Sequence, residues 1–221
     1  MDLPTLRALL DRHAPLQPVP LCPELSAYHA RSLVEVWEAA ERAAGEVLPA
    51  PFWAYPWAAG AALARVLLDH AELVRGRSVL DVGAGGGVSS LAAAKAGAAR
   101  VVANDIDPLA LGTVRLAAEA QGLEVETLLG DLTATPELVT GLDIVIAGDL
   151  AYEQQEAAQQ LGLLRVAARG GAWVLAGNAG RTWFDPAGME PVAEYRLAVP
   201  RDLEGVDERI ARVYRVLPDV A

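Results

Sequence analysis

The sequence predicts an α/β protein built on a doubly wound, mostly parallel sheet. From residue 76 onward, short apolar runs of strand length alternate with longer segments of helical character, which is the pattern of repeated βα units. One of these runs, Leu142–Ala147, is predominantly apolar, as expected for a strand covered on both faces. A glycine-rich turn at residues 83–87 directly follows the first run, where sheets of this kind turn into a helix.

The chain of 221 residues shows neither an internal repeat nor a low-complexity linker, so we expect a single domain over residues 1–221. Residues 1–75 are predicted to form a helical N-terminal extension, and residues 76–221 the sheet core. Apolar residues recur every three or four positions over residues 31–44, which is typical of an amphipathic helix. The aromatic segment Pro49–Trp57 follows, and a second helix is expected from about residue 58 to residue 74.

Strands and helices alternate in the sheet core. Gly97 and Gly122 are expected to end the first two helices, because glycine readily adopts the left-handed backbone conformation found at helix ends. Asp107 and Pro108 open the second helix as its N-cap and its first-turn residue. A third helix is expected over residues 151–168. The predicted strands are residues 78–82, 100–104, 124–129, 142–147 and 172–176.

The end of the chain departs from this alternation. Residues 192–199 and 209–217 have the character of two strands joined by a loop, with no obvious helix between them. Parallel neighbours need a long crossover, usually helical, whereas antiparallel neighbours need only a loop. We therefore expect an antiparallel hairpin to close the sheet.

The composition limits the partners that the protein can have. Lys and Arg total 18 against 29 Asp and Glu, a net charge of −11. A nucleic-acid-binding surface is normally basic, so we expect no nucleic-acid partner; a basic protein or a small molecule suits this charge better. Cys22 is the only cysteine, and the three histidines lack zinc-site spacing, so no metal site is expected.

The same features indicate a compartment. A lone cysteine permits no intrachain disulfide, which fits a reducing environment. The uncharged stretch Val47–Ala64 contains three prolines, so we expect no membrane span there. We expect a cytoplasmic protein.

The glycine turn is the strongest chemical motif. Asp81 precedes glycines at alternate positions, Gly83, Gly85 and Gly87, which allow a tight turn and close approach of a ligand. The turn that binds dinucleotides has a glycine at the sixth position, which here is Val88. The spacing favours S-adenosylmethionine, which offers an amino acid moiety, a ribose and an adenine but no phosphate. The competing hypothesis is a nicotinamide-dependent oxidoreductase. It is disfavoured also because the sequence shows no set of residues for hydride transfer.

Three more acids follow predicted strands, where open α/β sheets bind their ligands. Asp105 lies 24 residues after Asp81, close to the spacing at which an acid contacts ribose hydroxyls. Asp131 is placed to accept a hydrogen bond from an adenine amino group, although Gly-Asp is also a common turn. Asp149 follows the fourth strand. Asp107 is better explained as a helix cap than as a ligand.

Taken together, these motifs resemble the seven-stranded protein-lysine methyltransferases, in particular those that methylate the electron transfer flavoprotein β-subunit and their bacterial relatives. The resemblance extends from about Pro49 to Arg181. This sequence reads Trp-Ala-Ala-Gly at residues 57–60, where the family usually has Trp-Pro-Gly-Gly. It reads Gly-Asn-Ala-Gly-Arg at residues 177–181, where Gly-Asp-Pro-Gly-Arg is expected. The segments that carry the resemblance are residues 51–60, 81–87, 103–108 and 148–153.

The resemblance implies a Rossmann-like class I methyltransferase that binds S-adenosylmethionine and methylates a protein lysine. It implies that Trp57, together with Trp53, lies near the cofactor or the substrate channel; a buried aromatic patch is the alternative. It places Asp149 and Tyr152 where the target amine meets the methyl group. Asp149 is expected to recruit and orient the amine, and Tyr152 to shape the channel.

The implied partner is a protein with an accessible lysine, such as the electron transfer flavoprotein β-subunit or a ribosomal protein. Two alternatives stay open at this point. One keeps the fold but methylates a small nitrogen heterocycle, such as a nicotinamide-like compound, or an amine. The other is a catalytically silent module that binds the cofactor and transfers nothing.

Overall fold

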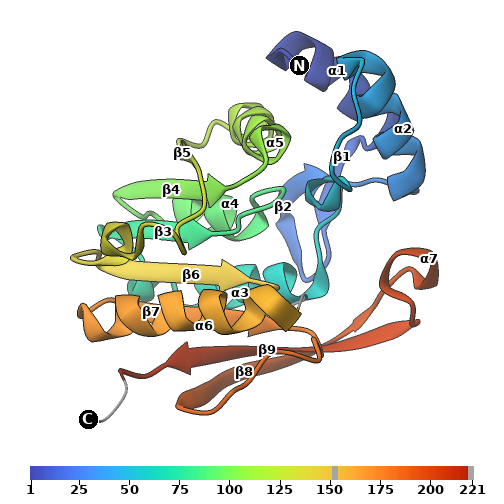
Figure 1. Ribbon diagram of the computed structural model, residues 1–221. Coiled ribbons are helices and arrows are strands. Elements are labelled where there is room, and N and C mark those ends of the chain that lie inside the picture. Colours follow the sequence, from blue (N-terminus) through green and yellow to red (C-terminus); the bar gives the residue numbers. More distant parts are fainter. Residues whose placement is uncertain (151–153, 219–221) are drawn as a thin grey trace.

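The computed structural model describes residues 1–150 and 154–218 of the chain. It contains a seven-stranded sheet in the order β5-β4-β3-β6-β7-β9-β8, with five parallel strands and an antiparallel pair at one edge. Figure 1 shows the hairpin β8/β9 lying along that edge. The predicted doubly wound, mostly parallel sheet is confirmed. Its strands are β3 Ser78–Val82, β4 Arg100–Asp105, β5 Glu126–Leu129, β6 Ile144–Gly148, β7 Trp173–Asn178, β8 Met189–Ala198 and β9 Glu208–Val216.

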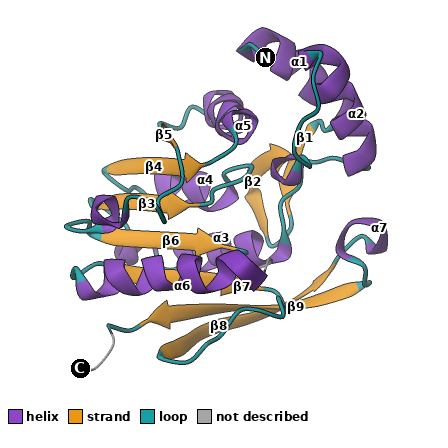
Figure 2. Ribbon diagram, in the orientation of Figure 1, coloured by secondary structure: helices purple, strands orange, loops and turns teal. Residues whose placement is uncertain are grey.

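The sheet has an apolar core on each of its two faces, and the side chains of its central strands alternate between them. In β6, Ile144 and Ile146 enter the larger apolar cluster, whereas Val145 and Ala147 enter a second cluster. The larger cluster includes α3 (Ala58–Asp69), α4 (Val88–Lys95) and α5 (Pro108–Ala120). The second includes α6 (Gln154–Arg169), which crosses the opposite face (Figure 2). Both faces are therefore covered, which explains the apolar composition of β6.

The N-terminal region differs from the expected helical extension because it also contains a two-stranded antiparallel sheet. Helices α1 (Leu3–His13) and α2 (Leu33–Ala44) flank strands β1 (Leu16–Val19) and β2 (Cys22–Tyr28). The Gln121 side chain, just after α5, accepts a hydrogen bond from Ser26 N and donates one to Ser26 O, both at 2.9 Å. This pair of bonds anchors β2 to the sheet core.

The loop of the C-terminal hairpin contains one helical turn, α7 (Arg201–Glu204), that the sequence did not indicate. Its last residue, Glu204, is buried with only 2% of its side chain exposed, and it pairs with Arg209 Nε at 3.1 Å. The second Glu204 oxygen accepts a hydrogen bond of 3.4 Å from the backbone N–H of Ala58, the first residue of α3. A carboxylate is favourable there, because the N-terminus of a helix carries a partial positive charge and unsatisfied N–H groups.

No helix within residues 1–150 and 154–218 is both long and apolar enough to cross a membrane.

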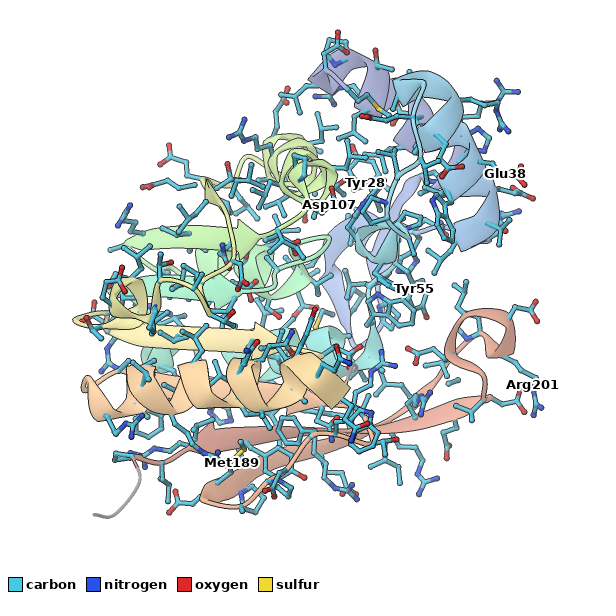
Figure 3. The ribbon with its side chains drawn as sticks, in the orientation of Figure 1. Tyr28, Glu38, Tyr55, Asp107, Met189 and Arg201 are labelled. Atoms are coloured by element: carbon cyan, nitrogen blue, oxygen red, sulfur yellow. The ribbon has the colours of Figure 1, made fainter. Side chains whose placement is uncertain are left out.

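We predict that Glu204→Ala lowers the free energy of unfolding by about 3 kcal/mol, because the change leaves Arg209 without its carboxylate and the α3 N-terminus without its acceptor. Urea unfolding followed by circular dichroism measures the difference. Asp207→Ala is the matched control, since Asp207 pairs with Arg201 on the same hairpin but both side chains are largely exposed. Arg201 marks this position in Figure 3. Equal destabilisation by the two substitutions would contradict the role given to Glu204.

Candidate functional site

The site lies where the sheet changes direction. The chain runs from β3 outward to β4 on one side, and β6 lies on the other side of β3. Such a switch point opens a crevice at the carboxyl ends of the strands. A pocket is found there, lined by the aromatic segment, the glycine turn and the end of β6. Its lining residues are Tyr55, Pro56, Trp57, Gly60, Asp81, Gly83, Ala84, Gly85, Gly86, Val88, Ser89, Gly148 and Asp149.

The glycine turn runs from β3 to α4 close against the aromatic segment. Gly83 and Gly85 line the pocket with φ of 64° and 53°, in the left-handed region. Gly87, at φ 81°, is the N-cap of α4. A Cβ on Gly86 would lie 2.5 Å from the backbone oxygen of Trp53. The turn therefore tolerates no side chain at position 86, because the aromatic segment packs directly against its backbone.

Asp81 is the buried acid of the pocket. It is 1% exposed, and its Oδ2 accepts a hydrogen bond of 2.6 Å from Ser90 Oγ on α4. Burial raises the pKa of Asp81 to about 7, opposed by the bonds from Ser90 and reinforced by the charge of Asp105. Asp81 is thus a buried carboxyl of the pocket lining with a pKa near neutral pH.

Asp105, at the end of β4, is attached to the glycine turn. It accepts hydrogen bonds from Gly85 N at 2.8 Å and from Asp107 N at 2.9 Å. Burial raises its pKa, and these backbone bonds counteract the rise. Asp107, labelled in Figure 3, caps α5 by accepting from Leu109 N at 2.8 Å, and its other oxygen accepts from Trp53 Nε1 at 2.9 Å. The expectation that Asp107 is a helix cap is confirmed.

Asp131 is exposed and is not among the residues that line the pocket. Its Oδ1 accepts from Thr133 N at 2.8 Å and from Thr133 Oγ1 at 2.7 Å, so it stabilises a turn. The side chain of Asn104 holds this turn next to β4, because it donates to the carbonyl oxygens of Leu128 at 3.0 Å and Gly130 at 2.8 Å. Sequence reasoning assigned no role to Asn104, although a buried amide at a strand end needs such partners.

Asp149 and Trp57, which line the pocket, both contact Arg181. Asp149 has a positive φ of 65°, and its side chain is 9% exposed. Arg181, in the loop after β7, donates from Nε to Asp149 Oδ1 at 2.8 Å and makes a second hydrogen bond from Nη2 to Oδ2. The Arg181 guanidinium also lies 5.5 Å from the centre of the Trp57 ring. Sequence reasoning missed Arg181 as a site residue, although its position was quoted in the resemblance.

The aromatic segment contributes a wall of the pocket and part of the core. Trp53 is 3% exposed, which fits the buried-patch reading, whereas Trp57 lines the pocket and donates from Nε1 to Phe52 O at 2.7 Å. Tyr55 packs edge-on against Trp57, with ring centres 5.2 Å apart. Burial, with the charge of Glu204, raises the pKa of Tyr55 to about 12, so the phenol stays neutral. Tyr152 lies outside the described residues.

Comparison with known proteins identifies the family. Residues 79–171 match the methyltransferase domain family. The electron transfer flavoprotein beta subunit lysine methyltransferase of Xenopus laevis is 33% identical over 204 residues, which cover 87% of this chain and 79% of that protein. This chain belongs to the class I protein-lysine methyltransferases. It is an S-adenosylmethionine-dependent methyltransferase.

Other relatives align over less of their length. The rat enzyme of the same name is 35% identical over 159 residues, which cover 68% of this chain and 60% of that protein. Ribosomal protein L11 methyltransferase of Escherichia coli is 33% identical over 132 residues, covering 58% and 44%. This chain thus spans about three fifths of the rat relative and less than half of the bacterial one.

Solved structures support the fold. The methyltransferase SMU.776, complexed with SAH, superposes with a TM-score of 0.56 at 12% identity, covering 87% of this chain and 53% of that one. TrmN from Thermus thermophilus superposes with a TM-score of 0.51 at 23% identity, covering 83% and 66%. At these identities the likeness concerns the fold alone.

The pocket fits S-adenosylmethionine by its chemistry. The sulfonium and the ammonium of the cofactor are cations and its ribose hydroxyls are hydrogen-bond donors, whereas the carboxylate of its amino acid moiety is an acceptor. The carboxyl group of Asp81 lines the pocket, and that of Asp105 accepts a hydrogen bond from Gly85 in the glycine turn. These two acids suit the cationic and hydroxyl groups of the cofactor.

We predict that Asp81→Asn weakens S-adenosylmethionine binding at least tenfold at pH 7.5, because it removes a charge-assisted contact to the ammonium. Wild-type affinity is expected to increase between pH 6 and 7.5, as Asp81 ionises, and the variant's affinity to change less. Isothermal titration calorimetry measures both. Asp143→Asn, at the opposite end of the strands, is the control with unchanged affinity.

The same substitution tests the raised pKa in the cofactor-free protein. A folded-state pKa above the unfolded value of 3.8 means that native Asp81 holds its proton more tightly, so its contribution to stability is lost as the pH rises toward 7. The melting temperature of Asp81→Asn should therefore fall less than that of the wild type between pH 5 and 8. Parallel pH curves for the two proteins would contradict a raised pKa.

Proposed function

We propose that the protein transfers the methyl group of S-adenosylmethionine to the ε-amino group of a lysine in another protein. The observation that carries the proposal is Asp149, a carboxylate at the end of β6 that lines the cofactor pocket and contacts the loop after β7. A carboxylate there is suited to attract and orient a lysine side chain. The relatives named as lysine methyltransferases support the same acceptor.

We propose the following cofactor contacts. Asp81 accepts from the ammonium of the amino acid moiety, and Asp105 accepts from the ribose hydroxyls. Gly83, Gly85 and Gly87 let the backbone approach the ligand. Trp57 forms a wall of the pocket. Asp131 is the candidate partner of the adenine amino group, through the oxygen that is not bonded to Thr133.

S-adenosylmethionine supplies an electrophilic methyl group on a sulfonium. The residues around it contribute mainly alignment and exclusion of water, since the reaction is an in-line displacement. The lone pair of the lysine nitrogen forms the new N–C bond, the C–S bond breaks with its electron pair kept by sulfur, and a proton passes from nitrogen to water. By resemblance, Tyr152 shapes the channel through which the amine arrives.

The nucleophile must be the neutral amine. A free lysine has a pKa of about 10.4, so its deprotonation near pH 7 costs roughly 4–5 kcal/mol. The positive sulfonium lowers this cost, whereas an isolated carboxylate would raise it by stabilising the ammonium. We therefore propose that Asp149 recruits and orients the amine rather than removing its proton.

The acceptor that we propose is a basic region of a protein, because the net charge of −11 favours such a partner. The electron transfer flavoprotein β-subunit and a ribosomal protein are the two candidates that the relatives' names suggest. We also propose that residues 1–221 act as one domain in the cytoplasm, supported by a shared apolar cluster that includes Leu10 and Ile146 and by the lone buried Cys22.

We predict that purified protein, incubated with radiolabelled S-adenosylmethionine and lysate of its own organism, labels a discrete protein band that contains methyl-lysine. Gel fluorography and mass spectrometry measure the outcome. Label found only in small molecules would instead support methylation of a heterocycle or amine. Binding of the cofactor with no transfer to any fraction would indicate a silent module.

We predict that Asp149→Asn reduces kcat/KM for the protein acceptor at least tenfold, because the amine loses a carboxylate oxygen that accepts its hydrogen bond and orients it. Steady-state kinetics with the labelled acceptor measures it. Asp202→Asn on α7 is the control and should leave kcat/KM unchanged. A variant at position 149 with wild-type kcat and wild-type KM for the acceptor would refute the role of Asp149.

A further inference from the structure

Arg181 compensates the charge of the acid that is proposed to receive the substrate. Its guanidinium makes two hydrogen bonds to the Asp149 carboxylate, one through each oxygen, the first of them 2.8 Å long. The Asp149 side chain is only 9% exposed and that of Arg181 is 26% exposed, so the pair is largely shielded from water. A two-point contact of this kind fixes both the position and the charge of the carboxylate.

The backbone around the pair holds Arg181 in place. Asn178 Oδ1 accepts a hydrogen bond of 2.9 Å from Arg181 N, and Gly180 has a φ of 86°. On the other side, Asp149 N donates to Gly177 O at 3.1 Å. The turn after β6 and the loop after β7 therefore form one unit, and the Trp57 ring lies along the guanidinium.

This arrangement bears on the proton of the acceptor. A lone carboxylate would favour the ammonium form of a lysine, which cannot attack the methyl group. A guanidinium paired with that carboxylate offsets the effect, while the free lone pairs of the carboxylate can still orient the amine. Arg181 also keeps its own charge at any relevant pH.

We propose that Arg181 is a positioning residue that balances the charge of Asp149, so that the pocket accepts the target lysine as a neutral amine. The inference rests on the proposed function, because it concerns the same acceptor site.

Other charged groups surround the pair, and each has a different partner. Asp81 on β3 accepts a hydrogen bond from Ser90 Oγ, and Asp105 on β4 accepts one from Gly85 N in the glycine turn. Glu204 and Arg209 pair with each other beneath the aromatic segment. Arg209 also approaches Gly180, since its Nη1 would lie 3.8 Å from a Cβ at that position. Tyr55 stays neutral.

The test measures kcat against pH at saturating acceptor for the wild type, Arg181→Gln and Arg181→Lys, because the pH profile of kcat reports the pKa values of the enzyme–substrate complex. The methyl acceptor is the protein that the wild type labels in lysate of the same organism, in purified form. Without the guanidinium, the lysine should hold its proton more tightly, so the rising limb of the Arg181→Gln profile should shift by about one pH unit to the alkaline side. The loss should be about tenfold at pH 7 and should shrink above pH 9. Arg181→Lys keeps a positive charge and should keep the wild-type midpoint, with a higher KM.

Three comparisons separate this role from a structural one. Arg215→Gln is the matched control, since Arg215 also lies over a tryptophan, Trp173, and pairs with an acid, Glu190, but on β9. It should leave the profile unchanged. The double variant Asp149→Asn/Arg181→Gln removes both charges and should return the midpoint toward the wild-type value. S-adenosylmethionine affinity, measured by calorimetry, should change less than threefold in Arg181→Gln.

The proposal is overturned if the kcat of Arg181→Gln falls by the same factor at every pH. It is also overturned if this factor equals the factor by which the variant loses cofactor affinity. An unfolded Arg181→Gln protein would leave the decision to Arg181→Lys and the double variant, and a shifted midpoint in either overturns it. A wild-type protein that methylates no lysine of any protein in lysate overturns the proposed function itself, and the role of Arg181 with it.

Discussion

The site depends on how closely α3 approaches the carboxyl ends of β6 and β7. A Cβ at Gly177 would lie 2.7 Å from the backbone oxygen of Ala59, and a Cβ at Gly148 would lie 2.9 Å from the Cα of Gly60. Only glycine at both strand ends lets the helix pack this near to the sheet. Because α3 begins directly after Trp57, this contact fixes the position of the Trp57 side chain beside the pocket and next to Arg181.

The N-terminus of α3 is also held by a residue of the hairpin at the edge of the sheet. The backbone N–H of Ala58 donates to buried Glu204, which the antiparallel hairpin carries beneath the aromatic segment. A proline at position 58, as the family pattern would have, has no N–H to donate. The N–H group that alanine has at position 58 therefore finds an acceptor in Glu204. Asn178, in place of the expected aspartate, likewise still accepts the N–H of Arg181.

Much of the fold followed from local pattern, because apolar runs, caps and glycines act over a few residues. The glycine turn, the Asp107 cap and the closing hairpin were predictable in this way. The strands β1 and β2 were not predictable, because Pro18, Pro20 and Pro23 are untypical of strands. Their contact with the sheet core is made by the side chain of Gln121, which is distant in sequence. The pairing of Arg181 with Asp149 joins two loops 32 residues apart, and no local pattern encodes such a contact.

The acids of the site differ in how their charge is compensated, and this difference decides what each can bind. Asp81, buried with a hydroxyl as partner, takes up a proton near neutral pH and is best satisfied by a cation. Asp105 is already bonded to backbone N–H groups and retains lone pairs for neutral donors such as hydroxyls. Asp149 is paired with a permanent cation, so a second cation gains little from it. One sheet edge can therefore hold an ammonium, a ribose and an uncharged amine at three carboxylates of the same kind.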